Sequence, residues 1–532
     1  MDKSLLDLAQ EVLGWPGRED LFHPSGAAKN VIARAADQKI GGAIRRLSEA
    51  AQAHVGILTV NPSIDSTEPP LALVCEFPRP VSQSVLRETQ RLAWNFSLSP
   101  LLITVEPHTI RGFTCCEQAP DESSPDRYEV KAIRREDLSL SNEAARALHW
   151  VSLVSGEFYQ ANEERFQRDQ RADQRLLDNL TFVRDKLLFG NTPRLNEDVC
   201  HDLLARVIFI QFLMDRKDQA GNSALDPSRL RELCGFSSFG QVLRDKESTY
   251  ALFDYLNQRF NGDLFSADNG SPQSAGQRLY RERRVVDQAH LDLMADLVDG
   301  ILEMKKDQLC LWKQYAFDVI PLEFISSIYE EFVSKKAKKE APHYTPQHLV
   351  DFVLDGVLPW NGHSWDLKIL DPACGSGVFL VKAYQRLVHR WRVAHDRQQP
   401  SPNVLRQLLE KNIFGVDINA QAVKVASFSL YLAMCDHIEP VDLWRKTSFP
   451  KLRGQRIVSS DFFSEDVPGF RTREEADSYD LVIGNPPWGK GSVTKQSQEW
   501  ADRAGWEASY KDIGPLFLPK AAALTRQHGS IS

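Results

Sequence analysis

The sequence predicts an α/β protein of three parts: a small α/β domain, a mostly helical domain and, at the C-terminal end, an open parallel sheet with flanking helices. Three observations lead to this prediction. From about residue 341, short apolar runs alternate with helical patterns, which is typical of βαβ units. Between about 150 and 340 helical patterns dominate, and before 150 apolar runs surround one helical segment. We therefore expect domains at 1–150, 151–340 and 341–532.

The composition is that of a globular chain. Its 532 residues are 42% hydrophobic and 26% charged, and the formal net charge is −8. An acidic total excludes a small, uniformly basic nucleic-acid binder, although local patches still allow DNA binding. Its eight cysteines form no Cys-x-x-Cys pair, so we expect no metal site and a reducing, cytoplasmic setting. No stretch is long and apolar enough for a membrane span or a signal peptide.

The first domain contains apolar runs that predict strands and one segment with helical spacing. The helical segment covers residues 82–96 and places its apolar side chains on one side. The predicted strands cover residues 54–60, 71–76, 101–105 and 110–115. This order of elements indicates a small mixed domain.

The second domain is predicted to consist of helices. One helix covers 195–214, with Asn196 as its cap and a strongly apolar second half. Further helical patterns cover about 287–315 and 320–337. A segment rich in Gly, Ser, Pro and Asn at 266–277 indicates an exposed loop between them.

The third domain contains the residues that indicate a site. Four predicted strands each end in a polar residue, and the carboxyl ends of parallel strands share one edge of a sheet, where ligands bind. The strands cover 367–371, 413–417, 456–461 and 480–485, and they end in Asp371, Asp417, Asp461 and Asn485. Residues 529–532 read as the opening of a fifth strand, so we expect the sheet to be incomplete at the C-terminus.

A glycine-rich turn follows the first of these strands and precedes a helical pattern at 378–391. It reads Asp371-Pro372-Ala373-Cys374-Gly375-Ser376-Gly377. Glycines there let the backbone approach a ligand, and the helix N-terminus offers free N–H groups. The whole string resembles the S-adenosylmethionine loop of amino-methyltransferases.

The next two strand ends suit the rest of such a cofactor. Asp417 can accept hydrogen bonds from both ribose hydroxyls, although a turn or helix-capping role is the alternative. Asp461 can accept the amino group of the cofactor's adenine. Phe462 can lie against the adenine ring, and Phe463 is a second candidate for this stacking.

The fourth strand is followed by Asn485-Pro486-Pro487-Trp488. An exocyclic amine on adenine is a poor nucleophile because its lone pair is delocalised into the ring. Asn485 Oδ1 and the Pro486 carbonyl can accept its two hydrogens and return electron density to nitrogen. Two successive prolines restrict the backbone there. Trp488 offers a face on which an extruded base can stack.

Residues 320–529 as a whole resemble γ-class N6-adenine DNA methyltransferases. They are similar to the modification subunits of type I restriction systems and to type IIG restriction–modification enzymes. The resemblance includes His343-Tyr344-Thr345-Pro346, the four strand ends in the family's order, and Gly514-Pro515-Leu516-Phe517. Upstream, the helical segments 208–216, 260–265 and 320–330 also resemble those enzymes. The aromatic residue after Pro-Pro is often Tyr in the family and is Trp488 here.

The resemblance implies a Rossmann-like sheet of S-adenosylmethionine-dependent methyltransferases and site-specific methylation of a flipped adenine in double-stranded DNA. It also implies a bacterial or archaeal restriction–modification or phage-defence system, with specificity, nuclease or helicase subunits as partners. The implied catalytic residues are Asn485, Pro486, Pro487 and Trp488. The implied S-adenosylmethionine-binding residues are Tyr344, Thr345, Pro346, Asp371, Ala373, Gly375, Gly377, Asp417, Asp461 and Phe462.

The first domain is similar to the nucleases that precede the methylase in type IIG enzymes. The strand at 71–76 ends in Glu76, but Pro78 stands where such a nuclease has Lys, and Asp65 falls in a loop. We therefore expect a broken metal site, and the alternative is a domain that docks a partner or DNA.

Two other functions compete with DNA methylation. Methylation of a protein glutamine also uses Asn-Pro-Pro to hold an amide NH2. A non-catalytic, cofactor-binding subunit of a defence complex is the second alternative, because the predicted sheet is incomplete.

Overall fold

The structure is a computed structural model, and it forms two compact units. The residues it describes are 3–22, 31–60, 70–117, 128–190, 193–218, 220–260, 272–304, 310, 312–321, 345–489, 492–507 and 512–532. One unit comprises Met1–Asn179, Asp215–Asn222 and Asp299–Pro321, and the other Leu180–Met214, Ser223–Val298 and Leu322–Ser532. The division into three domains remains a prediction, since contacts group the helices after residue 180 with the C-terminal sheet.

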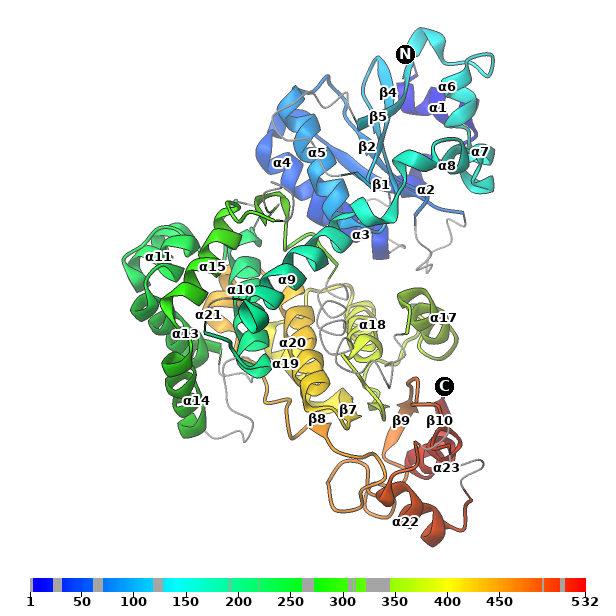
Figure 1. The fold of residues 1–532 in the computed structure, drawn as a ribbon. Helices are drawn as coiled ribbons and strands as arrows, with labels where there is room; N and C mark the ends of the chain where they lie inside the picture. Colours follow the sequence, from blue (N-terminus) through cyan, green and yellow to red (C-terminus); the bar gives the residue numbers. More distant parts are fainter. Residues whose placement is uncertain are drawn as a thin grey trace. The chain divides into compact units, whose positions relative to one another are not determined.

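The first unit is built on a five-stranded sheet of order β1-β2-β3-β4-β5 (Figure 1). Only β2 and β3 run parallel, and α5 connects them. The strands are β1 (His54–Leu58), β2 (Ala72–Glu76), β3 (Leu101–Val105), β4 (Thr109–Thr114) and β5 (Glu129–Arg134). The four predicted strands are confirmed, and β5 was not predicted.

Helices cover both faces of this first sheet. Along β2, Leu73 and Cys75 belong to one apolar cluster, and Ala72 and Val74 belong to another. The helix α5 (Gln83–Phe96) begins at its cap Ser82, as predicted for residues 82–96. The other α-helices that begin in this unit are α1 (Leu5–Leu13), α2 (Arg18–Phe22), α3 (Val31–Ala36), α4 (Gly42–Leu47), α6 (Glu143–Ala147), α7 (Trp150–Ser155), α8 (Glu157–Ala161) and α9 (Ala172–Phe189).

The second unit begins with helices. The predicted cap at Asn196 is confirmed, since its side chain accepts the Val199 N–H at 2.8 Å. The helices are α10 (Glu197–Asp215), α11 (Pro227–Cys234), α12 (Phe239–Leu243), α13 (Lys246–Phe260), α14 (Pro272–Val285) and α15 (Gln288–Asp299). A buried ion pair of 2.5 Å joins Arg206 to Glu282, and Tyr250 donates to the same carboxylate.

Two predicted boundaries in this helical region were wrong. The helix predicted over 287–315 ends at Asp299, because Gly300 adopts a φ of 69° that no helix continues through. The loop predicted over 266–277 already turns helical at Pro272, a residue that favours the first turn of a helix. The predicted helix at 320–337 lies almost wholly outside the described residues.

The sheet of the second unit is parallel, with the order β10-β9-β6-β7-β8. The chain proceeds from β6 outward to β7 and β8, then crosses to β9 on the other side of β6. The direction of winding therefore reverses between β6 and β9. The strands are β6 (Ile369–Asp371), β7 (Ile413–Asp417), β8 (Ile457–Ser459), β9 (Tyr479–Val482) and β10 (Thr525–Ile531).

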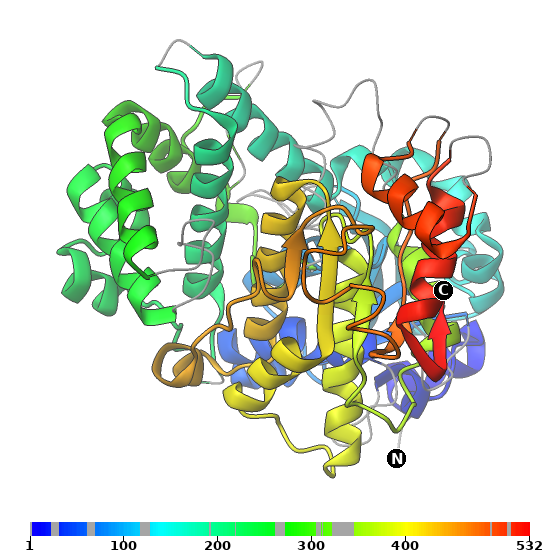
Figure 2. The same cartoon turned by 90° about the horizontal axis from the view of Figure 1, so that it is seen from below.

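Helices also cover both faces of this second sheet. On one face α18 comes so close to β7 that a Cβ at Gly415 would lie 2.7 Å from Leu380 Cδ1. The other face, which includes Leu370 and Val482, is covered by an aromatic-rich cluster from α22, α23 and the loop between β8 and β9. Figure 2 shows α22 and α23 beside the sheet. The helices are α17 (Gln347–Val357), α18 (Val378–Ala394), α19 (Pro402–Asn412), α20 (Ala420–Asp436), α21 (Pro440–Lys446), α22 (Lys495–Ala504) and α23 (Gly514–Leu524).

The four predicted strands of the second sheet are confirmed: β7 has the predicted bounds, and the other three are shorter than predicted. β8 and β9 end two and three residues before Asp461 and Asn485, so both side chains stand on loops beyond the sheet. The predicted opening of a fifth strand at 529–532 belongs to β10, which starts at Thr525. Among the described residues, no helix combines the length and the apolar character that a membrane span needs.

The structure predicts different costs for two glycine substitutions in the second unit. Gly377 and Gly454 have φ values of 87° and 71°, so Ala at either position is strained by about 1 kcal/mol. A Cβ at Gly377 would also lie 2.9 Å from the Ala426 Cβ on α20, whereas a Cβ at Gly454 meets nothing within 4 Å. We expect Gly377→Ala to lower the urea unfolding midpoint clearly more than Gly454→Ala. Equal shifts would contradict the close packing of α18 on α20.

Candidate functional site

The glycine-rich turn after β6 is fixed by its own backbone. The Asp371 side chain is 1% exposed and accepts the Ala373 N–H at 3.0 Å. The Gly377 N–H donates to the Cys374 carbonyl at 2.8 Å, and Gly377 starts α18 in a left-handed conformation. The turn therefore presents the N-terminus of α18 at the carboxyl edge of the sheet.

Asp417 joins the turn to the neighbouring strand. Its carboxylate accepts the Gly375 N–H at 2.9 Å and the Asn419 N–H at 2.8 Å. Each carboxylate oxygen keeps a second lone pair, so these bonds leave capacity for ligand hydroxyls. Burial raises the pKa of Asp417, and both N–H donors oppose that rise.

Asp371 has a carboxyl group whose pKa is strongly raised at this edge of the sheet. Burial raises its pKa to about 8, the Ala373 N–H opposes the rise, and the negative charge of Asp417 adds to it. A Cβ at Gly484 would lie 2.5 Å from Asp371 Oδ1. Only glycine therefore lets the β9 end pass so close to the β6 end, immediately before Asn485.

The loop after β8 holds one carboxylate oxygen without a partner. Asp461 Oδ1 accepts the Phe463 N–H at 2.8 Å, while Oδ2 is buried and has no hydrogen-bond partner among the described residues. The Phe462 ring is 3% exposed, and it stacks on Phe517 with ring centroids 5.2 Å apart. The Lys520 ammonium lies 5.0 Å from the same ring. Phe462 thus packs in the core. Asp461 Oδ2 is a buried acceptor that a ligand donor could pair with.

The Asn-Pro-Pro-Trp segment brings three predicted site residues together. Asn485 Nδ2 donates to Thr345 Oγ1 at 3.2 Å, and Trp488 Nε1 lies 3.4 Å from Asn485 Oδ1. The Trp488 side chain is 54% exposed, so much of its ring is open to a planar ligand. Pro346 is the N-cap of α17, and Tyr344 lies outside the described residues.

Residues 512–514, at the start of α23, hold the Asn-Pro-Pro-Trp loop by hydrogen bonds and by close packing. Asp512 Oδ1 accepts the Gly489 N–H at 3.2 Å and the Gly514 N–H at 3.0 Å. A Cβ at Gly514 would lie 2.6 Å from Trp488 Cε3, so the indole rests directly on the backbone of α23. Ser492 adds a further link, because its hydroxyl accepts the Ile513 N–H at 3.0 Å.

The sequence interpretation missed two residues of this site. Ile418 follows Asp417 and is 71% exposed, so an apolar side chain stands beside the predicted ribose ligand. An apolar residue immediately after a strand-end carboxylate is the signal that could have found it. Asp512 gave no such signal, because its role depends on contacts with Gly489, which is distant in sequence.

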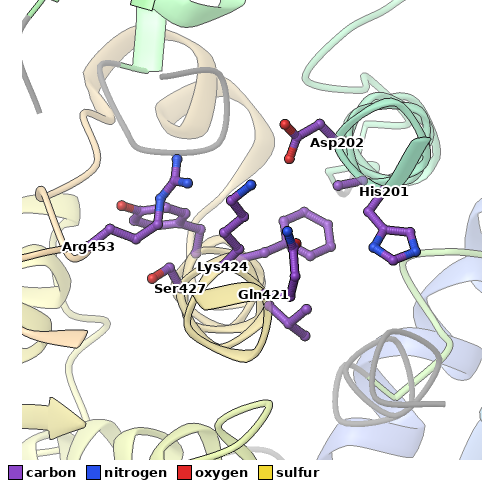
Figure 3. A pocket seen from close by; sticks show the side chains of 10 residues that line it. His201, Asp202, Gln421, Lys424, Ser427 and Arg453 are labelled. Atoms are coloured by element: carbon purple, nitrogen blue, oxygen red, sulfur yellow. The ribbon is translucent and has the colours of Figure 1, made fainter. Parts of the chain in front are cut away.

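A separate hollow lies between α10 and α20 (Figure 3). Lys424 on α20 pairs with Asp198 on α10 at 3.4 Å. Burial and the nearby Arg184 lower the pKa of His201 to about 4, so this lining residue is neutral at pH 7. The other lining residues are Asp202, Ala205, Gln421, Val425, Ser427, Phe428, Tyr431 and Arg453. Since none of the predicted site residues lines this hollow, we assign it no part in the chemistry.

The candidate metal site of the first unit is not assembled among the described residues. Glu76 at the end of β2 forms an ion pair with Arg18, and Asp65 lies outside the described part of the chain. No group of three or more His, Cys, Asp or Glu side chains in the described ranges is arranged to hold a metal ion.

Comparison with known proteins matches this chain to DNA-modifying enzymes. The family model described as "Eco57I restriction-modification methylase" matches residues 411–532. Two curated relatives are the "Adenine-specific methyltransferase PglX" of Streptomyces coelicolor, 27% identical over 197 residues, and the "Type II restriction enzyme and methyltransferase RM.Eco57I" of Escherichia coli, 24% identical over 269 residues. These matches cover 31% and 40% of this chain but only 16% and 26% of the two relatives.

A solved structure of the type IIL restriction–modification enzyme MmeI in complex with DNA is also similar. Its TM-score is 0.42 at 17% sequence identity, and the match covers 65% of this chain and 48% of that one.

The raised pKa of Asp371 predicts a pH-dependent stability difference. Between pH 4 and pH 8 the folded carboxyl keeps a proton that the unfolded one releases, so this group makes the folded state less stable as pH rises. Asp371→Asn removes that titration. We expect the variant to gain stability relative to the wild type from pH 5 to pH 8, by on the order of a few kcal/mol. Unfolding curves at the two pH values measure this, and a constant difference would contradict the assignment.

Proposed function

We propose that this chain, whose residues 411–532 belong to the Eco57I restriction-modification methylase family, transfers a methyl group from S-adenosylmethionine to the N6 amine of a flipped adenine in DNA. The observation that carries the proposal is the position of Asn485 to Trp488. This loop follows β9, and the glycine-rich turn follows β6, on the two sides of the point where the winding of the sheet reverses. A cofactor at the turn would therefore lie beside a base at the loop.

The residues present fit S-adenosylmethionine. The buried, unpartnered Asp461 Oδ2 suits the amino group of the cofactor's adenine, and Asp417 suits the ribose hydroxyls. The exposed side chain of Ile418 would cover one face of the adenine ring. The parallel strand order supports a Rossmann-like methyltransferase sheet. The other residues that we assign to this cofactor are Tyr344, Thr345, Pro346, Asp371, Ala373, Gly375 and Gly377. The predicted stacking of Phe462 on the adenine ring is not retained, because its ring is buried against Phe517.

The chemistry that we assign to the loop concerns the target amine. When bound, S-adenosylmethionine supplies a methyl group on a positively charged sulfur, which keeps the C–S bonding pair and leaves as a neutral thioether. Asn485 Oδ1 and the Pro486 carbonyl accept hydrogen bonds from the two N–H groups of the amine. These bonds return electron density to the nitrogen, whose lone pair then forms the new N–C bond. Trp488 holds the base by stacking. The amine then loses one proton, which solvent takes up because the exposed Asn485 offers no basic group.

The biological setting follows from the relatives. We propose a role in bacterial or archaeal restriction–modification or phage defence, acting on double-stranded DNA in the cytoplasm. The matched segments span only a minor part of both relatives. Recognition of a specific DNA sequence, and partnership with a specificity, nuclease or helicase subunit, are therefore also proposals.

Replacing Asn485 tests this function. The assay incubates tritiated S-adenosylmethionine with unmethylated DNA and counts the label in DNA and in protein separately. We expect the wild type to label DNA and Asn485→Ala to lose at least about 100-fold in rate, a loss typical when a group that stabilises the transition state is removed. Label transfer that survives the substitution would contradict the mechanism. Label in protein alone would favour glutamine methylation, and cofactor binding without transfer would favour a non-catalytic subunit.

Asp461→Asn tests the cofactor site. The amide would place an NH2 group or a single oxygen where the carboxylate offers an unpaired acceptor to the cofactor's amine. We expect S-adenosylmethionine to bind at least about tenfold more weakly, because a buried donor would lose its partner. Titration calorimetry measures the affinity. Asp466 is a carboxylate of the same loop, and Asp466→Asn serves as the matched control. Unchanged affinity in the Asp461 variant would remove this residue from the proposed site.

A further inference from the structure

A hydrogen bond joins two predicted site residues that the sequence interpretation assigned to different ligands. Thr345 belongs to the segment that resembles a cofactor-contacting motif, and Asn485 belongs to the loop proposed to hold the base. Asn485 Nδ2 donates to Thr345 Oγ1 at 3.2 Å. Thr345 directly precedes Pro346, the N-cap residue of α17. A proline restricts the backbone of the residue before it, so the Thr345 hydroxyl is presented from a restricted backbone.

The orientation of the Asn485 amide decides whether it can assist the amine. An amide carries an acceptor oxygen and a donor NH2 of nearly the same size, and rotation by half a turn exchanges them. Only the orientation that points Oδ1 at the base lets the amide accept a hydrogen bond from the amine. The opposite orientation points a donor at a donor and would repel it.

Two neighbours act on the two ends of this amide. An indole N–H can only donate, so Trp488 Nε1, at 3.4 Å, favours an oxygen on its side. A hydroxyl can accept or donate, and Thr345 accepts from the NH2 group that this choice leaves on the other side. Trp488 is itself held in place, since its ring rests on Gly514. Together the pair fixes Oδ1 on the side of the exposed indole.

We propose that Thr345 is a positioning residue for base activation, through Asn485, in addition to any contact it makes with the cofactor. The proposal rests on the function proposed above. The Thr345 hydroxyl retains the Asn485 NH2 group, so Oδ1 stays directed to the place where a base stacks on Trp488. The start of α17 and the catalytic loop are thereby coupled through one side-chain hydrogen bond.

The kinetic test compares Thr345→Val, which removes the hydroxyl at nearly constant volume, with Thr345→Ser, which keeps it. We expect Thr345→Val to lower kcat about fivefold to tenfold, the effect of losing one orienting hydrogen bond, whatever change in KM for S-adenosylmethionine accompanies it. Thr345→Ser should recover most of the lost kcat. A rise in KM with unchanged kcat would mean that Thr345 serves the cofactor alone and would overturn the proposal.

A second readout needs neither DNA nor cofactor. In protein labelled with 15N at asparagine, Asn485→Ala identifies the Asn485 side-chain NH2 signal. We expect Thr345→Val to shift this signal and speed its exchange with solvent, and Thr345→Ser to leave it close to that of the wild type. An unchanged signal in Thr345→Val would overturn the proposal. If the wild type fails to methylate DNA while the signal shifts as expected, the proposed function fails and the hydrogen bond stands.

Discussion

The hydrogen bond from the Gly375 N–H to the Asp417 carboxylate joins the ends of two neighbouring strands, and the candidate site depends on it. It holds the glycine-rich turn against β7, and the turn in turn sets where α18 begins. Asp417 also accepts the Asn419 N–H, so one carboxylate fixes both the turn after β6 and the turn after β7. The cost of this arrangement is visible in the raised pKa values of Asp417 and Asp371, two carboxyl groups buried close together.

The proposed catalytic loop is fixed by the same means, through close backbone approach and short polar links. Gly484 lets the loop leave β9 against Asp371, and Gly514 lets the Trp488 ring lie on α23. Asp512 ties the far end of the loop to the start of that helix. All of these contacts are made within the chain itself and position the loop, and positioning and electrostatics are how proteins lower reaction barriers. Asn485 retains one freedom, the rotation of its amide, and Thr345 and Trp488 restrict it.

Much of this could be predicted because strand ends are local features: an apolar run followed by a polar residue identified Asp371, Asp417, Asp461 and Asn485. The strand β5 was missed because Ile133 is its one buried residue and a register shift interrupts its pairing with β4, so no apolar run or regular alternation indicates it. The helix predicted over 287–315 was too long because helical periodicity outweighed the single stop signal at Gly300. Asp512 was out of reach because its role depends on a contact with Gly489, which is distant in sequence. Ile418 was overlooked although it directly follows a strand-end carboxylate.

If this arrangement directs a methyl group to the N6 atom of adenine, the chemical identity of the methylated product will show it. Unmethylated DNA of mixed sequence, incubated with the chain and S-adenosylmethionine and then digested to nucleosides, can be resolved by mass spectrometry. We expect N6-methyldeoxyadenosine as the methylated nucleoside, because Asn485 and the Pro486 carbonyl suit an exocyclic amine held against Trp488. Methylated deoxycytidine, or methylated protein with unmodified DNA, would contradict it.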